Sequence, residues 1–249
     1  MKVVGMIPAR MGSSRFPGKP LEKILGIPMV EHVYKRSEMS LTLDGLFVAT
    51  PDKEIKKIVE GFGGEAIMTS PLHDRCTDRI AEAMENIEAD IVVNIQGDEP
   101  MLYPDIIDLS VKPLLEDESI LCSNPIVKIN DINTFNDRNQ IKVVCDQQGF
   151  ILFMSREPIP TMVRMGMKIP MLKQICIMPF RKDFLVTYNH LPQTPLEISE
   201  SVDMLRVLEH GYRIKAVEVP FETFSVDTAQ DLVKVEKLMK NDPLLEKYM

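Results

Sequence analysis

Short apolar runs alternate with amphipathic stretches along the first hundred residues, and this alternation restricts the fold more than any other feature. Four runs have the composition of buried strands, at residues 3–7, 46–50, 66–68 and 91–95. Helical spacing of apolar side chains marks the stretches between them, at residues 29–36, after Asp52 and at 77–87. Continuously apolar strands separated by helices indicate a parallel sheet with helices on both faces. We therefore predict a Rossmann-like, three-layer α/β fold with a mostly parallel sheet.

The pattern becomes richer in strands after about residue 120. A hairpin is predicted from two strands, at residues 140–145 and 150–154, which are joined by a polar turn at residues 146–149. Further strands are predicted at 173–179 and 213–219, and further helices at 197–209 and 228–239. Residues 157–171, which contain three prolines, stay unassigned. We expect one domain over residues 1–249, with about 120–220 forming a β-rich inserted lobe.

Composition excludes several classes of function. The 249 residues carry a formal net charge of −8, which argues against a surface for nucleic acid. No apolar run is long enough to span a bilayer, and the first residues do not have the pattern of a signal peptide. The four cysteines show neither metal-ligand nor CxxC spacing, so we expect reduced thiols in a cytoplasmic protein.

Residues 8–20, directly after the first strand, form a cationic loop in an otherwise acidic chain. The loop contains Arg10, Arg15 and Lys19 together with Gly12 and Gly18. In open α/β sheets ligands bind at the carboxyl ends of strands, and glycines let the backbone approach them closely. The spacing does not match a Walker A loop, and GxGxxG is absent. The pattern predicts a site for an oligophosphate.

Two aspartates are candidate Mg²⁺ ligands, and each has an alternative role. Asp98 follows the predicted strand 91–95, and Asp227 precedes the last predicted helix. Mg²⁺ in such sites takes one or two carboxylates plus phosphate oxygens. Asp98 could instead cap a following helix, and Asp227 could be the N-cap of the last one. The metal role requires that the two residues lie close together.

The segment 73–79 precedes a predicted helix. Thr77 and Asp78 could simply cap that helix. Alternatively, the amino end of the helix could bind a base or a phosphate. The residues by themselves do not decide between these two roles.

Several segments together resemble the sugar-acid cytidylyltransferases, most closely the 3-deoxy-manno-octulosonate cytidylyltransferase family. The resemblance is carried by IPARMGSSRFPGKPL (7–21), HDRCTDRIAEA (73–83), NIQGDEP (94–100), FNDRNQIKVV (135–144), FMSREPIP (153–160), PLEISESVDMLRVL (195–208) and SVDTAQDL (225–232). It implies Mg²⁺-dependent transfer of CMP from CTP to the anomeric hydroxyl of a sugar acid, for the synthesis of lipopolysaccharide or surface polysaccharide. It also implies a homodimer, with the β-rich lobe as the sugar-binding and dimer-contact region.

The resemblance also implies roles for individual residues. Nucleotide contacts are expected from Ala9, Arg10, Ser13, Arg15, Lys19, Thr77 and Arg79. Catalytic roles are expected for Arg15, Lys19 and Asp98, and Mg²⁺ would be held by Asp98 and Asp227. Contacts with the sugar acid are expected from Gln96, Arg156, Gln174 and Asp203, with Arg156 reaching the carboxylate.

The chain departs from the family pattern where the sugar is recognised. Gln174 and Met178 replace a His and a Tyr, Asp203-Met204 replaces a Glu-Gln pair, and Cys76 replaces a Gly. Lost polar partners change the selection among hydroxyl patterns. An altered acceptor, such as an 8-amino derivative, a nonulosonate or a sugar phosphate, is therefore an alternative. An inactive nucleotide-binding homologue is another.

Overall fold

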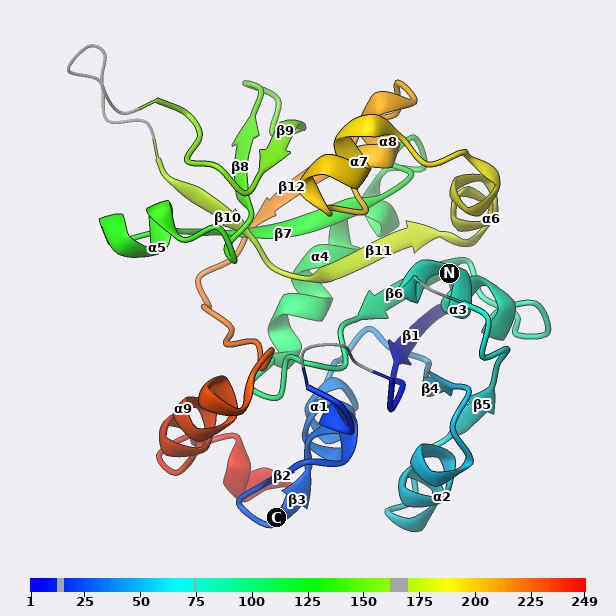
Figure 1. Cartoon of the computed structure of the whole chain (residues 1–249). Helices are drawn as coiled ribbons and strands as arrows, with labels where there is room; N and C mark the ends of the chain where they lie inside the picture. Colours follow the sequence, from blue (N-terminus) through cyan, green and yellow to red (C-terminus); the bar gives the residue numbers. More distant parts are fainter. Residues whose placement is uncertain (13–15, 74, 162–169) are drawn as a thin grey trace. The chain divides into compact units, whose positions relative to one another are not determined.

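The computed structural model describes residues 1–249 except 13–15, 74 and 162–169 (Figure 1). The chain divides into two compact units. The first unit comprises Met1–Asp108 and Thr223–Met249, and the second comprises Leu109–Glu222. The stretch predicted as a β-rich lobe falls within the second unit.

A parallel sheet forms the centre of the first unit. Its strands follow the order β6 (Ile91–Ile95), β1 (Val3–Pro8), β4 (Gly45–Thr50) and β5 (Ala66–Met68). All four strands were predicted, and β1 and β6 are almost entirely buried, as expected for a parallel sheet with continuously apolar strands. The predicted α/β fold with a mostly parallel sheet is confirmed.

Helices pack around this sheet, as Figure 1 shows. They are α1 (Met29–Ser37), α2 (Lys53–Gly61) and α3 (Cys76–Ala83). The helix α9 (Ala229–Met239) lies instead beside the short hairpin of β2 (Lys23–Ile24) and β3 (Ile27–Pro28). The helix α4 (Pro104–Glu116) crosses the boundary between the units, which lies after Asp108. The prediction for 77–87 was too long, because the chain tightens to i→i+3 bonding after Ala83.

The second unit is built on a mixed sheet. Its strands follow the order β12 (Lys215–Glu218), β7 (Ser123–Lys128), β10 (Leu172–Gln174), β8 (Lys142–Cys145) and β9 (Ile151–Ser155). All neighbouring pairs are antiparallel except β12 with β7. The predicted hairpin is present as β8 and β9. The unit also contains β11 (Ile177–Arg181), α5 (Ile132–Asn136), α6 (Lys182–His190), α7 (Pro195–Glu200) and α8 (Leu205–Glu209).

Two predicted elements of the second unit are interrupted in the structure. The strand predicted at 173–179 is divided into β10 and β11, because a tight turn joins the amide of Ile177 to the carbonyl of Ile175 at 2.8 Å. The helix predicted at 197–209 is divided into α7 and α8. Ser201 ends α7 in the left-handed conformation with φ of 51°, which breaks the helical hydrogen bonding.

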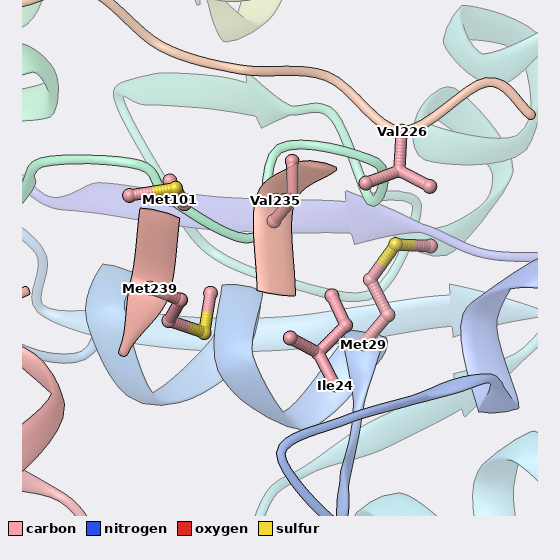
Figure 2. Packing of buried hydrophobic residues seen from close by; sticks show 6 residues of the cluster. All are labelled: Ile24, Met29, Met101, Val226, Val235 and Met239. Atoms are coloured by element: carbon pink, nitrogen blue, oxygen red, sulfur yellow. The ribbon is translucent and has the colours of Figure 1, made fainter. Parts of the chain in front are cut away.

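A buried cluster ties together segments of the first unit that are distant in sequence. It contains Ile24, Met29, Met101, Val226, Val235 and Met239, which point toward one another in Figure 2. Burial of each such side chain contributes about 1.5–3 kcal/mol relative to exposure. The cluster therefore anchors the β2 hairpin, the segment after β6 and the segment before α9 against one another.

In the part of the chain that the structure describes, no helix combines the length and the apolar character needed to cross a membrane.

Candidate active site

The loop after β1 places Lys19 through local backbone geometry. Gly18 has a φ of 76°, a region where side chains other than glycine are strained, and it immediately precedes the short helix η1 (Lys19–Leu21). The amide of Gly18 donates to the carbonyl of Met11 at 3.0 Å, and the amide of Met11 donates to the carboxylate of Asp52 at 2.8 Å. The loop is thus closed on itself and tied to the end of β4.

A glycine brings the loop after β6 against the end of β1. A Cβ atom at Gly97 would lie 2.8 Å from the carbonyl oxygen of Pro8, closer than real contacts allow. Glycine at this position therefore lets the two strand ends approach, and Asp98 follows directly. Asp98 does not cap a helix, because the next helix, α4, begins only at Pro104.

Asp227 comes from the segment before α9. The amide of Val226 donates to the carbonyl of Asp98 at 2.9 Å, which joins the two segments directly. The alternative role of Asp227 as an N-cap is wrong. Thr228 is the N-cap of α9, with its side chain accepting from the amide of Asp231 in a capping box.

Lys19, Asp98 and Asp227 therefore meet in space. The Lys19 Nζ lies 2.8 Å from Asp98 Oδ2, 3.4 Å from Asp227 Oδ1 and 2.9 Å from the carbonyl of Val226. The exposed fractions of the three side chains are 13%, 27% and 29%, so the group is partly buried but open to solvent. We call this set the acidic pair with its lysine.

The donor set of the acidic pair suits Mg²⁺. Two carboxylates and one main-chain oxygen already converge on a single cation, the Lys19 ammonium. Mg²⁺ binds oxygen ligands and uses few carboxylates when a phosphate completes its coordination. The described residues contain no group of three or more His, Cys, Asp and Glu side chains placed to hold a metal, so a metal at the acidic pair would rely on two carboxylates and on ligands from the substrate.

Two arginines gather near the amino end of α3. The exposed side chain of Arg10 and the buried side chain of Arg79 both donate to the carbonyl of His73, at 3.4 and 3.2 Å. Burial, followed by repulsion from Arg10, lowers the pKa of Arg79 from its ordinary value. Neighbouring cations of this kind favour an anionic ligand. Arg79 also donates to Thr69 and Ser70, so its described contacts hold this turn, and its contact with the nucleotide stays a prediction.

Thr77 lies at the second position of α3 and is 1% exposed. Its hydroxyl has no hydrogen-bond partner among the described residues. It does not cap α3, because the N-cap residue is Arg75. A buried hydroxyl without a partner is costly, so this position fits a contact with a ligand.

Three further residues are expected to contact the nucleotide, and the structure describes only one of them. Ala9 is buried, and its amide donates to the carbonyl of Ala49 at 3.0 Å. Ser13 and Arg15 lie outside the described residues.

The residues expected to contact the sugar acid come from both units. In the first unit, the side-chain amide of Gln96 donates to Cys76 Sγ at 3.5 Å and to Asn94 Oδ1 at 3.3 Å. In the second unit, the side-chain amide of Gln174 donates to Asn124 Oδ1 at 2.5 Å, and the main-chain carbonyl of Asp203 accepts from the Tyr188 hydroxyl at 3.0 Å.

Arg156, also in the second unit, donates to three main-chain carbonyls: Nε to Glu200 at 2.6 Å, Nη1 to Arg138 at 3.0 Å and Nη2 to Ser201 at 3.2 Å. Two positions that depart from the family pattern, Met178 and Met204, are buried in the core at 4% and 1% exposure.

Sequence reasoning missed residues that act through the main chain. Asp52 holds the cationic loop, and its position just after a strand was the available signal. Lys142 is fully buried beside the main chain of Arg156, and nothing in the local sequence indicates that contact.

The parallel sheet, with a lysine and two carboxylates gathered beyond its strand ends, defines an α/β nucleotidyltransferase. The sequence matches the family described as Cytidylyltransferase over residues 4–215. The chain is 41% identical to the 3-deoxy-manno-octulosonate cytidylyltransferases of Geotalea uraniireducens and Geobacter metallireducens, covering 96% of this chain and 100% and 99% of theirs. The protein belongs to the 3-deoxy-manno-octulosonate cytidylyltransferase family.

A solved structure supports the same assignment. It is that of a CMP:2-keto-3-deoxy-manno-octonic acid synthetase complexed with CTP, which is 38% identical to this chain. The TM-score is 0.91, and the match covers 96% of this chain and 99% of the other. The resemblance read from the motifs is confirmed.

Proposed function

We propose that the protein transfers CMP from CTP to the anomeric hydroxyl of 3-deoxy-manno-octulosonate, releasing pyrophosphate, for the synthesis of lipopolysaccharide or surface polysaccharide. The observation that carries the proposal is the convergence of Lys19, Asp98 and Asp227 from three separate segments. Nucleotide binding alone would not require two carboxylates beside the lysine, so an inactive homologue is disfavoured.

In this reaction the anomeric oxygen of the sugar bonds to the α-phosphorus, and the bond from that phosphorus to the pyrophosphate oxygen breaks. The hydroxyl proton passes to solvent water, and negative charge gathers on the departing pyrophosphate. Lys19 and Arg10 supply cationic N–H donors for phosphate oxygens, and Arg15 is proposed to act with them. Thr77 offers its buried hydroxyl to the nucleotide.

We assign the metal site to Asp98 and Asp227. Bound Mg²⁺ would neutralise phosphate charge and orient the α-phosphate for in-line attack. The two carboxylates, joined through the Val226 amide, hold their spacing without a ligand. The Lys19 ammonium balances the charge of the two carboxylates.

On the acceptor side, we propose that Arg156 pairs with the sugar carboxylate, and that Gln96, Gln174 and Asp203 select hydroxyl groups. A guanidinium matches a planar carboxylate with two parallel hydrogen bonds. The curated relatives do not favour an altered acceptor, because they carry one substrate name, 3-deoxy-manno-octulosonate.

We further propose a homodimer formed through the β-rich second unit, and a cytoplasmic location. The edge strand β9 supports the first point, because it carries Leu152 at 61% exposure. The four cysteines support the second, because they form no disulfide among the described residues and reduced thiols persist in the cytoplasm.

Pyrophosphate release in the presence of CTP, Mg²⁺ and 3-deoxy-manno-octulosonate tests the proposed reaction. We expect release only when nucleotide, metal and acid are all present, with a product that contains CMP and the sugar acid. Parallel reactions with 8-amino-3-deoxy-manno-octulosonate and a nonulosonate measure the acceptor preference. Faster turnover of either analogue would overturn the acceptor assignment, and the absence of acid-dependent release would overturn the reaction.

A further inference from the structure

Two buried lysines face each other across neighbouring strands of the second unit. Lys142 on β8 is registered opposite Lys173 on β10, and the two residues are 0% and 6% exposed. Like charges directly opposite each other in an antiparallel pair are unfavourable. Both lysines therefore need compensating partners.

The partners of the two lysines differ in kind. Lys173 Nζ pairs with the carboxylate of Glu222 at 2.7 Å and with Gln140 Oε1 at 3.2 Å. Lys142 Nζ donates instead to three carbonyls, those of Asp137 at 2.7 Å, Gln140 at 2.6 Å and Arg156 at 2.5 Å. All three N–H donors of the Lys142 ammonium are used by main-chain oxygens.

These three carbonyls belong to two different loops. Asp137 and Gln140 lie between α5 and β8, and Arg156 lies just after β9. Burial lowers the pKa of Lys142, and the nearby carboxylates of Asp137 and Glu157 oppose that shift. The ammonium is thus a buried cationic link between the two loops.

The guanidinium of Arg156 extends the same network. Its three recorded acceptors are the carbonyls of Arg138, Glu200 and Ser201, so each of its nitrogens uses one N–H. A guanidinium has five N–H donors. After these three contacts with the described residues, one N–H remains on each of the two terminal nitrogens. Two N–H groups on the two terminal nitrogens of a guanidinium can donate parallel hydrogen bonds to one carboxylate.

The backbone of Arg156 is held as firmly as its side chain. Its amide donates to the Glu200 carboxylate at 2.7 Å, and its carbonyl accepts from Lys142. The same carboxylate accepts from Ser155 at 2.9 Å. Lys142 therefore acts on Arg156 from the buried side of the loop, and Glu200 acts on it from α7.

We infer that Lys142 is a positioning residue, whose buried ammonium holds the loop that carries Arg156 and so sets the two remaining N–H groups for the carboxylate of the sugar acid. This inference rests on the proposed function and deepens its acceptor side. Lys142 touches neither substrate. Its effect is confined to recognition of the acid and does not extend to CTP.

Lys142→Met tests the inference, with Lys173→Met as the matched control. We expect Lys142→Met to raise the KM for the sugar acid roughly 10- to 100-fold, because small displacements of a positioning group are costly, while the KM for CTP changes by less than about twofold. Lys173→Met, which also removes a buried lysine, should leave both KM values near those of the wild-type protein. Lys142→Gln keeps one donor and should give an intermediate KM; it replaces the Met variant if that one does not fold.

A double variant shows whether Lys142 affects the KM for the acid through Arg156. In Arg156→Met, adding Lys142→Met should raise the KM for the acid by no more than about twofold, since coupled residues do not add. Additive losses, or an equal rise in the KM for CTP, would overturn the inference and indicate a purely structural role.

Hydrogen exchange gives a readout that does not depend on turnover. Amides of residues 137–141, 155–157 and 200–201 should exchange faster in Lys142→Met than in Lys173→Met. Unchanged exchange in these segments would overturn the inference even if the enzyme is active. If exchange is faster in Lys142→Met but the wild-type protein does not transfer CMP, the link between the loops is supported and the proposed function is rejected.

Discussion

The acidic pair with its lysine and the network around Arg156 both hold a cationic side chain in a fixed place, but they use different partners. In the first, the Lys19 ammonium meets two carboxylates and one carbonyl, and all three side chains stay partly exposed. In the second, Lys142 and Arg156 donate mainly to main-chain carbonyls, and Lys142 is fully buried. Charge paired with charge can rearrange when a metal or a phosphate arrives. A buried ammonium bound to three carbonyls is part of the fold.

The largest expected effect is a loss of turnover, and it concerns the acidic pair. Asp98→Asn removes one carboxylate but keeps the size of the side chain. We expect kcat to fall by about a thousandfold or more, because stabilisation of transition-state charge is lost. CTP binding measured calorimetrically without Mg²⁺ should be largely kept. Near-normal turnover in this variant would refute the metal assignment.

The second prediction concerns the packing beneath the acidic pair. Met239→Ala should lower the free energy of unfolding by about 2–4 kcal/mol, since it opens a cavity in the cluster of Figure 2. Urea denaturation measures the loss, and activity at low temperature reports whether Asp98 and Asp227 stay together. An unchanged stability would mean that the cluster does not anchor these segments.

A third pair of variants separates a structural role from a functional one at neighbouring positions. Thr228→Ala removes the N-cap of α9 and should lower the free energy of unfolding by about 1 kcal/mol with little change in kcat. Asp227→Asn should do the reverse, with a large loss of kcat and a small change in stability. Thermal denaturation and initial rates measure both. The opposite pattern would restore Asp227 as the cap.

The smallest effect concerns pH. His32 is buried, accepts a hydrogen bond from Tyr248 and donates to the carbonyl of Ile24, each at 2.8 Å. Burial is the main cause that lowers the pKa of His32. Its contribution to stability is flat above its unfolded-state pKa of about 6.5 and is lost as pH falls toward the lower folded value, because only the unfolded chain takes up the proton.

Chemical denaturation between pH 7.5 and 5.5 measures this slope. His32→Gln keeps a donor for Ile24 but does not titrate, so its slope over the same range should be shallower. An equal slope in both proteins would assign the pH dependence to other groups.

Most of the first unit could be predicted because its signals are local. β1, β4, β5 and β6 are apolar runs of the length that a parallel sheet buries. Predictions were less accurate where one residue decides the outcome. The left-handed Ser201 divides α7 from α8, and the turn at Ile175 divides β10 from β11. Neither residue is a glycine or a proline, so neither gave a signal.

The candidate site shows the same division. Lys19, Asp98 and Asp227 were found because each lies in a short, recognisable segment. Asp52 and Lys142 were missed because their partners are main-chain atoms, which every residue carries. Which carbonyl lies beside a given ammonium depends on how the loops fold.

The sequence by itself determined the class of fold, the family and the candidate residues for phosphate and metal, because periodicity and motifs are properties of neighbouring residues. Only the tertiary structure decided that Asp227 meets Asp98 and does not cap α9, and that Lys142 supports Arg156. The physical reason is that these contacts join different segments of the chain. Asp98 and Asp227, for example, are more than a hundred residues apart. Buried side chains such as Met101, Val226 and Met239 set the distances among the segments that carry the acidic pair.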